Sequence, residues 1–224
     1  QRVTPEDITS DLHDCLERLG FDRIDIFGLH RDDPAKPVGP IVDVLNKHVE
    51  EGTIDAFAAS NWRHERIREA NEYAARNGLR GFVVSSPHYS LGEQYDDPWG
   101  NSVTITGDGN IEARRWYASK REGSDGILLM PWSGLCGGFF SGRFRRDNLG
   151  SFTAPADERC IRCYCGEENF RRLDRAKKVA DELNARAGAS GGAGGQGEVS
   201  VAQIALAWLL TGPLPCIPLT AAWT

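Results

Sequence analysis

The chain has 224 residues, enough for one sizeable hydrophobic core, and its net charge of −6 is that of an ordinary globular protein without a basic stripe, so nucleic acid is a poor partner. The longest mostly apolar run, 199–210, is far shorter than the ~20 residues that a membrane span needs. No signal peptide precedes the first helix pattern, and we expect a soluble, cytoplasmic protein with no membrane contact.

Six cysteines are spread along a chain that is large enough to fold without covalent staples. We therefore predict reduced thiols in a cytoplasmic protein. The spacing Cys160-x-x-Cys163-x-Cys165 raises a metal hypothesis, but structural zinc sites need four ligands and no fourth Cys or His stands nearby at a standard spacing, so we predict no metal site. The chain begins with Gln1 and its single methionine is Met130, which suggests an excerpt of a longer product or a gene model without its start.

The first half of the chain alternates between helix and strand patterns. Thr4-Pro5-Glu6-Asp7 begins a helix with a capping residue, a proline and acidic residues, and Gly20 ends that helix after Leu19. The hydrophobic pattern then predicts, in order, a strand over 24–29, a helix over 38–51, a strand over 54–59, a helix over 63–77 and a strand over 81–85.

The second half continues this alternation with longer interruptions. Residues 87–110 are rich in Gly, Asp and Asn and are predicted to form a loop. Segment 143–166 has no clear period, and the Gly/Ala/Ser tract 188–197 is predicted to be a flexible insertion. The remaining predictions are a helix over 111–120, a strand over 127–132, a glycine-rich segment 133–142, helices over 167–186 and 199–210, and a short strand over 216–219.

Strands and helices in repeated alternation build a parallel sheet with right-handed crossovers. The strand 24–29 leads into His30, and in α/β barrels the carboxyl end of the sheet carries the chemistry. About five strands can be counted, whereas a closed barrel of this type has eight. The predicted fold is therefore a single α/β domain over 1–224, a partial (β/α)8 TIM barrel of about five parallel strands with flanking helices.

Five segments, in the same order, resemble signatures of the aldo-keto reductase family. They are LGFDRIDIFGLH at 19–30, Ser60-Asn61-Trp62, Pro87-His88-Tyr89-Ser90-Leu91, Trp132-Ser133-Gly134-Leu135, and AQIALAW at 202–208. The resemblance covers nearly the whole chain, from the family's third helix to its eighth strand. It implies a barrel that reduces aldehydes and ketones with NADPH, and whose first three strands are missing from this chain.

The resemblance also implies an active site of four polar residues, Asp, Tyr, Lys and His. The histidine matches His30, whose imidazole would hydrogen-bond the substrate carbonyl and orient it for hydride attack. In the family the other three come from upstream segments, and they have no match here, since all five tyrosines lie downstream in other contexts. From the chain alone we therefore expect weak dinucleotide binding and no useful carbonyl reduction.

The family's cofactor contacts match further residues. Its Ser and Asn on the nicotinamide carboxamide match Ser60 and Asn61, and Ser86 stands where the family usually has a Gln. Trp132 matches the aromatic ring that stacks on the nicotinamide. The chain ends near the site for the 2′-phosphate, so the choice between NADP and NAD stays open. The loop that wraps the pyrophosphate matches Ser133, Leu135 and Gly137.

Several of these residues also have a structural interpretation. Taken alone, His30 would be a satisfied structural histidine, and Trp132 would be a core residue. Ser60-Asn61 could cap the helix that follows Arg63, with or without a functional role. The three histidines on predicted helices are expected on solvated faces; they are His13, His48 and His64.

Two hypotheses follow. The first is an NADP-dependent aldo-keto reductase acting on a small-molecule aldehyde or ketone, with this chain carrying the histidine and the nicotinamide contacts. The second is a non-catalytic relative, a pseudoenzyme or scaffold subunit that keeps the nucleotide contacts; an unrelated barrel enzyme is disfavoured by the order of the motifs. Because an incomplete sheet leaves its edges open, we also expect oligomers or aggregation through those edges.

Overall fold

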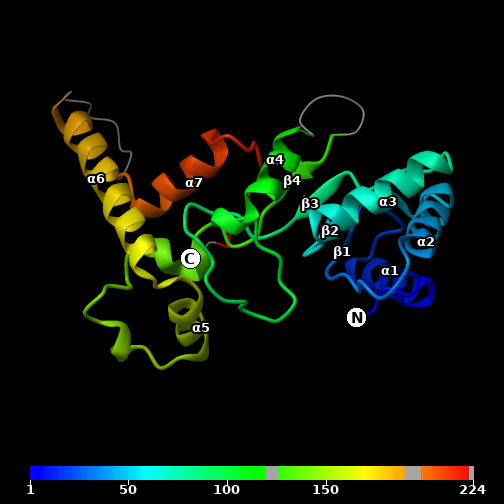
Figure 1. Cartoon of the computed structure of the whole chain (residues 1–224), viewed down its shortest axis with the longest axis horizontal. Helices are drawn as coiled ribbons and strands as arrows, with labels where there is room; N and C mark the ends of the chain where they lie inside the picture. Colours follow the sequence, from blue (N-terminus) through cyan, green and yellow to red (C-terminus); the bar gives the residue numbers. More distant parts are fainter. Residues whose placement is uncertain (120–125, 190–197, 222–224) are drawn as a thin grey trace. The chain divides into compact units, whose positions relative to one another are not determined.

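The computed structural model describes residues 1–119, 126–189 and 198–221. It is an α/β structure that separates into two compact units (Figure 1). The first unit comprises Gln1–Pro87, Asn101–Val103 and Glu112–Met130, and the second comprises His88–Gly100, Thr104–Ile111 and Pro131–Thr224. The prediction of a single domain stays a prediction, and each unit is described by itself.

The first unit contains a four-stranded parallel sheet in the order β1-β2-β3-β4, with helices between the strands. Helix and strand boundaries agree closely with the predicted pattern up to residue 76. The elements are α1 (Pro5–Leu19), β1 (Ile24–Leu29), α2 (Val38–Glu50), β2 (Ile54–Ser60), α3 (His64–Arg76), β3 (Val84–Ser86), α4 (Ile111–Ser119) and β4 (Leu128–Leu129).

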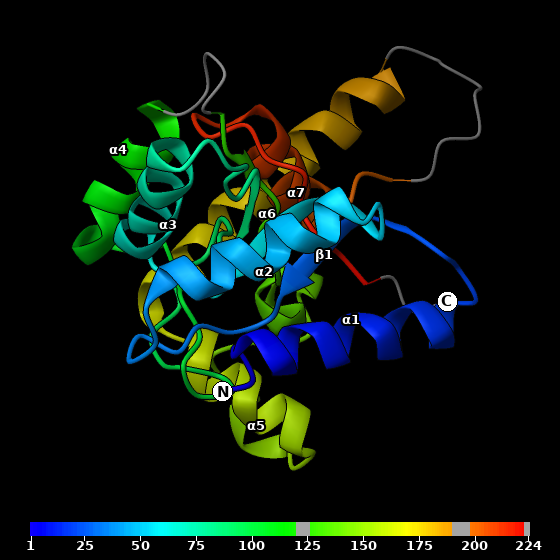
Figure 2. The ribbon, with the colours of Figure 1, turned by 90° about the vertical axis from the view of Figure 1, so that its right-hand side faces the viewer.

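The ends of α1 show how local chemistry defines an element. The Thr4 side chain accepts from the Asp7 backbone N–H and the Asp7 side chain accepts from the Thr4 N–H, which completes a capping box. At the other end Gly20 has φ 69°, a left-handed conformation that glycine adopts at low cost. Ile8 and Leu12 are buried, and α1 packs beside α2 (Figure 2).

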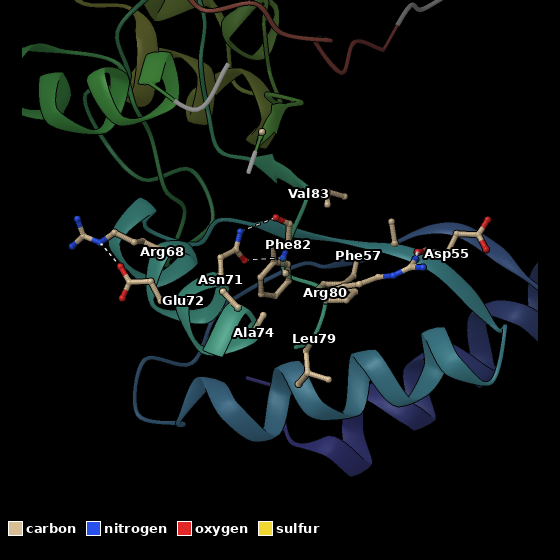
Figure 3. Close-up of a pocket in the computed structure, with 14 residues that line it drawn as sticks. Asp55, Phe57, Arg68, Asn71, Glu72, Ala74, Leu79, Arg80, Phe82 and Val83 are labelled. Carbon is tan, nitrogen blue, oxygen red and sulfur yellow. Dashed lines mark hydrogen bonds and ion pairs between the residues drawn. The ribbon is translucent and has the colours of Figure 1, made fainter. Parts of the chain in front are cut away.

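Two asparagine side chains bond the backbone at the start of the predicted third strand, where hydrogen bonds to a neighbouring strand were expected. Asn46 of α2 donates to the Arg80 carbonyl and accepts from the Arg80 N–H, at 2.9 and 2.8 Å. Asn71 of α3 makes the same pair of bonds to Phe82, at 2.9 and 2.8 Å (Figure 3). Because side chains satisfy these backbone groups, β3 begins at Val84 instead of the predicted residue 81.

The second unit is built on helices and short 3-10 turns around an aromatic core. Phe139, Phe140, Phe144 and Phe170 lie in this core and are nearly or fully buried. Its elements are η1 (Asp108–Asn110), η2 (Cys136–Ser141), η3 (Leu149–Ser151), α5 (Pro155–Tyr164), α6 (Glu167–Ala189) and α7 (Val201–Thr211). The predicted insertion 188–197 overlaps the end of α6, and its residues 190–197 lie outside the described residues.

The predicted fifth strand over 216–219 is wrong. The described residues contain four strands, and none covers this segment. Pro213, Pro215 and Pro218 each lack a backbone N–H, so the segment cannot donate the regular bonds of a ladder. Leu219 does donate to the Pro131 carbonyl at 2.8 Å and Cys216 lies in an isolated bridge, but these contacts do not make a strand. The described sheet therefore has four strands instead of about five, and the partial (β/α)8 barrel stays a prediction.

Two other predictions need correction. Helix α5 lies inside segment 143–166, where the sequence showed no clear period; Pro155 at its first turn followed by Asp157 and Glu158 was the available signal. His48 is 2% exposed instead of solvated, because its ring bonds Thr9 at 2.9 Å and Glu51 at 3.0 Å. Among the described helices, none has both the length and the apolar character to cross a membrane.

Candidate active site

Four predicted site residues gather at the carboxyl ends of the strands in the first unit. His30 follows β1, Ser60 ends β2, Asn61 follows it, and Ser86 ends β3. The register pairs Leu29 with Ala59 and Ser60 with Ser86. Parallel strands bring their carboxyl ends to one edge of the sheet, which is why residues far apart in the sequence meet here.

Asn61 joins the three strand ends through its side chain and its backbone N–H. Its Nδ2 donates to the His30 carbonyl at 3.3 Å and to Ser60 Oγ at 3.0 Å, while its Oδ1 accepts from the Val103 N–H at 3.1 Å. Its backbone N–H donates to the Ser86 carbonyl at 3.2 Å. Asn61 is 5% exposed and has φ 57°, a left-handed conformation in which Asn is enriched among non-glycine residues. The asparagine is therefore a structural joint as well as a candidate cofactor ligand.

The other predicted role of Ser60 and Asn61, as a helix cap, is wrong. The cap residue of α3 is Arg63, and its side chain makes no capping bond. Ser60 Oγ instead donates to the Ser86 carbonyl at 3.2 Å. The two polar side chains are therefore committed to the strand ends and not to the helix that follows them.

His30 is exposed and carries no strong charge partner that would favour its imidazolium form. Partial burial, and then the neighbouring Arg31, lower the pKa of His30 below its ordinary value. The neutral ring that results near pH 7 has one N–H donor and one acceptor nitrogen. His30 also lines a pocket of about 480 Å3 that lies between α1 and β1, the edge strand of the described sheet.

A largely buried ion pair fixes the segment that follows His30. Arg66 Nε of α3 lies 3.1 Å from Asp32 Oδ2, with the two side chains 12% and 8% exposed. Arg66 also donates to the Lys36 carbonyl, and its guanidinium lies over the Trp62 ring. Burial raises the pKa of Asp32, and Arg66 opposes that effect. This pair could not be predicted from the sequence, because nothing in the pattern links positions 34 residues apart.

The other four predicted residues lie in one loop of the second unit. The Trp132 ring is half-buried and contacts the His88 ring at 4.9 Å and the Trp99 ring at 5.2 Å between centroids. Leu135 packs against the aromatic core. The backbone is left-handed at Ser133, Cys136 and Gly137, with φ 53°, 53° and 60°. Leu135 has φ −100° and ψ 15° and is followed by the left-handed Cys136, so the backbone curls here; within this curl the Cys136 N–H donates to the Ser133 carbonyl at 2.8 Å.

His88 has a larger structural role than the sequence indicated. It lies in one of the five family-like segments, but no role was predicted for it. His88 is fully buried and contacts Trp132 through both its ring and its backbone. Burial lowers its pKa to about 3, so the ring is neutral. The signal in the sequence was only its position next to Tyr89 in the motif; its partner Thr104 is 16 residues away.

A separate pocket lies at the opposite end of the sheet from His30. It has a volume of about 490 Å3 and is lined by residues of β2, α3 and the segment before β3 (Figure 3). Phe57 and Phe82 form an apolar wall, and Arg80 extends past them to donate to the Asp55 carbonyl. None of the predicted site residues lines it.

The sequence profile of the Aldo/keto reductase family matches residues 1–222. The chain belongs to the aldo/keto reductase family. This confirms the resemblance seen in the five motifs, and it agrees with an α/β fold that has a parallel sheet and flanking helices.

Individual relatives carry different descriptions. The chain is 29% identical over 206 residues to a probable voltage-gated potassium channel subunit beta of Oryza sativa subsp. japonica, covering 92% of this chain and 54% of the relative. It is 24% identical over 212 residues to an uncharacterized oxidoreductase of Bacillus subtilis (strain 168), covering 95% and 53%. It is 24% identical over 198 residues to the versiconal hemiacetal acetate reductase of Aspergillus parasiticus, covering 88% and 48%. This aldo/keto reductase chain therefore spans about half the length of the relatives it matches.

No group of three or more metal-ligating side chains that could hold an ion occurs in the described parts of the chain. All six cysteines are described and are free of disulfide bonds. Cys160 donates to the Cys136 carbonyl at 3.4 Å, so it packs in the aromatic core of the second unit.

Proposed function

We propose that this chain supplies the substrate-orienting histidine and the nicotinamide contacts of an NADPH-dependent reductase of small aldehydes or ketones. The observation that carries the proposal is the hydrogen-bonded group of His30, Ser60, Asn61 and Ser86 at the carboxyl edge of a parallel sheet. Family membership supports the reaction class. The six free thiols suit a reducing compartment, and we propose the cytoplasm.

The chemical groups of the predicted site residues suit a nicotinamide dinucleotide. Ser60 and Asn61 offer hydroxyl and amide groups for the carboxamide, and Ser86 adds a shorter hydroxyl where an amide is usual. Trp132 offers a half-buried aromatic face for the nicotinamide ring. Ser133, Leu135 and Gly137 lie in the curled loop that suits a pyrophosphate.

In the proposed reaction the cofactor, when bound, supplies the hydride that reduces the carbonyl carbon. The neutral His30 ring donates its N–H to the carbonyl oxygen, which orients the substrate and stabilises the negative charge that develops there. Asn61 and Ser60 would hold the carboxamide of the bound cofactor. No residue of this chain is assigned as the proton donor.

A fusion protein tests this function. The part of the Bacillus subtilis relative that this chain does not match would be joined to residues 1–224, and NADPH oxidation would be followed with 4-nitrobenzaldehyde. We expect turnover by the fusion and none by the chain alone, because general acid catalysis supplies ~10² to 10⁴ in rate. The His30→Ala change in the fusion should lower kcat about 100-fold while NADPH binding persists.

The second candidate function is a non-catalytic subunit that binds nucleotide. It is favoured by the relatives of Oryza sativa and Arabidopsis thaliana that are described as probable voltage-gated potassium channel beta subunits. The same fusion separates the two candidates. NADPH binding without aldehyde-dependent oxidation would favour the subunit, and failure to bind NADPH at all would count against both.

We also propose that the free edge of β1 associates with further chains. β1 ends the described strand order, Ile26 on it is 46% exposed, and Phe21 just before it is 64% exposed. Size-exclusion chromatography of the chain should therefore show oligomers or aggregates. Ile26→Lys should reduce association, because a charge on an edge strand opposes pairing, whereas Leu210→Lys on exposed α7 should not. A compact monomer that unfolds cooperatively would contradict this proposal.

A further inference from the structure

A chain of buried hydrogen bonds crosses the second unit beneath the Trp132 loop. His88 Nδ1 lies 2.9 Å from Thr104 Oγ1, and His88 Nε2 lies 3.3 Å from Ser90 Oγ. Beyond these partners, Ser90 Oγ contacts Cys136 Sγ at 3.1 Å and Thr104 Oγ1 contacts Thr106 Oγ1 at 2.8 Å. His88 and Ser90 are 0% and 3% exposed, so no solvent competes for these bonds.

The donors in this chain can be assigned one by one. Ser90 donates its hydroxyl hydrogen to the Gly92 carbonyl at 2.7 Å. Ser90 Oγ must therefore accept from His88 Nε2–H, which leaves Nδ1 as the acceptor of the Thr104 hydroxyl hydrogen. This tautomer agrees with the neutral state that burial gives the ring. The ring is thus fixed in position by one donor and one acceptor.

His88 is joined to Trp132 in two ways. The two residues form a parallel backbone bridge, and their rings meet at 4.9 Å between centroids with planes inclined by 51°. The bridge fixes where the Trp132 backbone lies, and the ring contact limits how its indole can turn.

Two more contacts connect the same network to the loop after Trp132. Ser90 bonds Cys136, and the ring of Tyr164 lies 5.5 Å from that of His88 on the side of α5. A Cβ at Gly137 would lie 3.4 Å from the Tyr164 ring. The network around His88 therefore contacts the loop at Trp132, Cys136 and Gly137.

We propose that His88 is a positioning residue for the cofactor: its ring, fixed between Ser90 and Thr104, holds the Trp132 indole in the orientation that stacks on a nicotinamide. This inference rests on the proposed function, because it takes Trp132 as the stacking residue. His88 itself is fully buried and acts through Trp132. Loss of the His88 ring should therefore weaken binding of the nicotinamide half of the dinucleotide and leave binding of the adenosine half unchanged.

The test compares two ligands that differ only in the nicotinamide. Dissociation constants for NADPH and for 2′-phospho-ADP-ribose would be measured by isothermal titration calorimetry on wild-type chain, His88→Phe and Thr104→Val. We expect NADPH to bind about tenfold more weakly to both variants, the equivalent of one aromatic stacking contact. Binding of 2′-phospho-ADP-ribose should change less than about twofold, and Thr104→Ser should restore NADPH binding because it keeps the hydroxyl donor.

Other results would overturn the inference in distinguishable ways. Equal weakening of both ligands would assign His88 a purely structural role, and unchanged NADPH binding in both variants would remove it from the site altogether. If His88→Phe does not fold, the milder Thr104→Val and Thr104→Ser pair decides the question. A wild-type chain that binds neither ligand would overturn the proposed function, and this inference with it.

Discussion

Acidification from pH 7 to pH 5 should lower the free energy of unfolding by about 2 kcal/mol through His88 alone. The pKa of His88 is about 3 in the folded chain, against an ordinary value of 6.5. Between these values the unfolded state binds a proton that the native state does not, so stability falls as pH falls and is fully present above pH 6.5. By pH 3 the loss should reach roughly 4 kcal/mol.

Urea unfolding of wild-type chain and of His88→Phe at matched pH values isolates this effect. Phenylalanine does not titrate, so the variant should lose about 2 kcal/mol less than the wild type between pH 7 and pH 5. The lowered pKa of His30 acts in the same direction, but it is present in both proteins and cancels. The neighbours Tyr164 and Cys136 have raised pKa values and stay neutral throughout this range. Parallel pH profiles for the two proteins would rule out a neutral, buried His88.

The elements that the sequence predicted well are those whose signals are local. The strand Ile24–Leu29 and the start of α1 at Pro5 follow from hydrophobic period and capping chemistry within a few residues. The wrong predictions involve groups that are distant in sequence or lack a donor. Asn46 and Asn71 shorten β3 from two different helices, and the prolines around Cys216 prevent a fifth strand.

In the candidate site, too, some features could be predicted from the sequence and others depend on residues that are distant in sequence. His30, Ser60 and Ser86 could be placed together from the sequence, because the carboxyl ends of parallel strands must meet. The structural work of Asn61 could not be foreseen, since it depends on the positions of the His30 carbonyl and the Val103 N–H. His88 was equally hidden, because a histidine in a motif does not reveal which hydroxyls will flank its ring.

Replacing Asn61 with aspartate should cost about 2 to 4 kcal/mol of stability, although the two side chains have nearly the same shape. Asn61→Asp removes the two bonds that Nδ2 donates to the His30 carbonyl and to Ser60 Oγ. It also turns a carboxylate oxygen toward the His30 carbonyl, in a site that is 5% exposed. The bond that Oδ1 accepts from the Val103 N–H can persist, so the loss comes from the two donated bonds and from the buried carboxylate.

Asn77→Asp is the matched control, because Asn77 also ends an element and donates from Nδ2 to the Tyr73 carbonyl, at 2.8 Å, but on an exposed surface. Water replaces that bond, and the new carboxylate opposes the dipole at the C-terminal end of α3, so the control should cost no more than about 1 kcal/mol. Both variants would be compared with wild type by urea unfolding at the same pH. The penalty of Asn61→Asp should shrink as pH falls, because burial raises the pKa of the introduced carboxyl and its protonated form can again donate to the His30 carbonyl. If Asn61→Asp cost no more than the exposed control, Asn61 would not be the joint of the three strand ends.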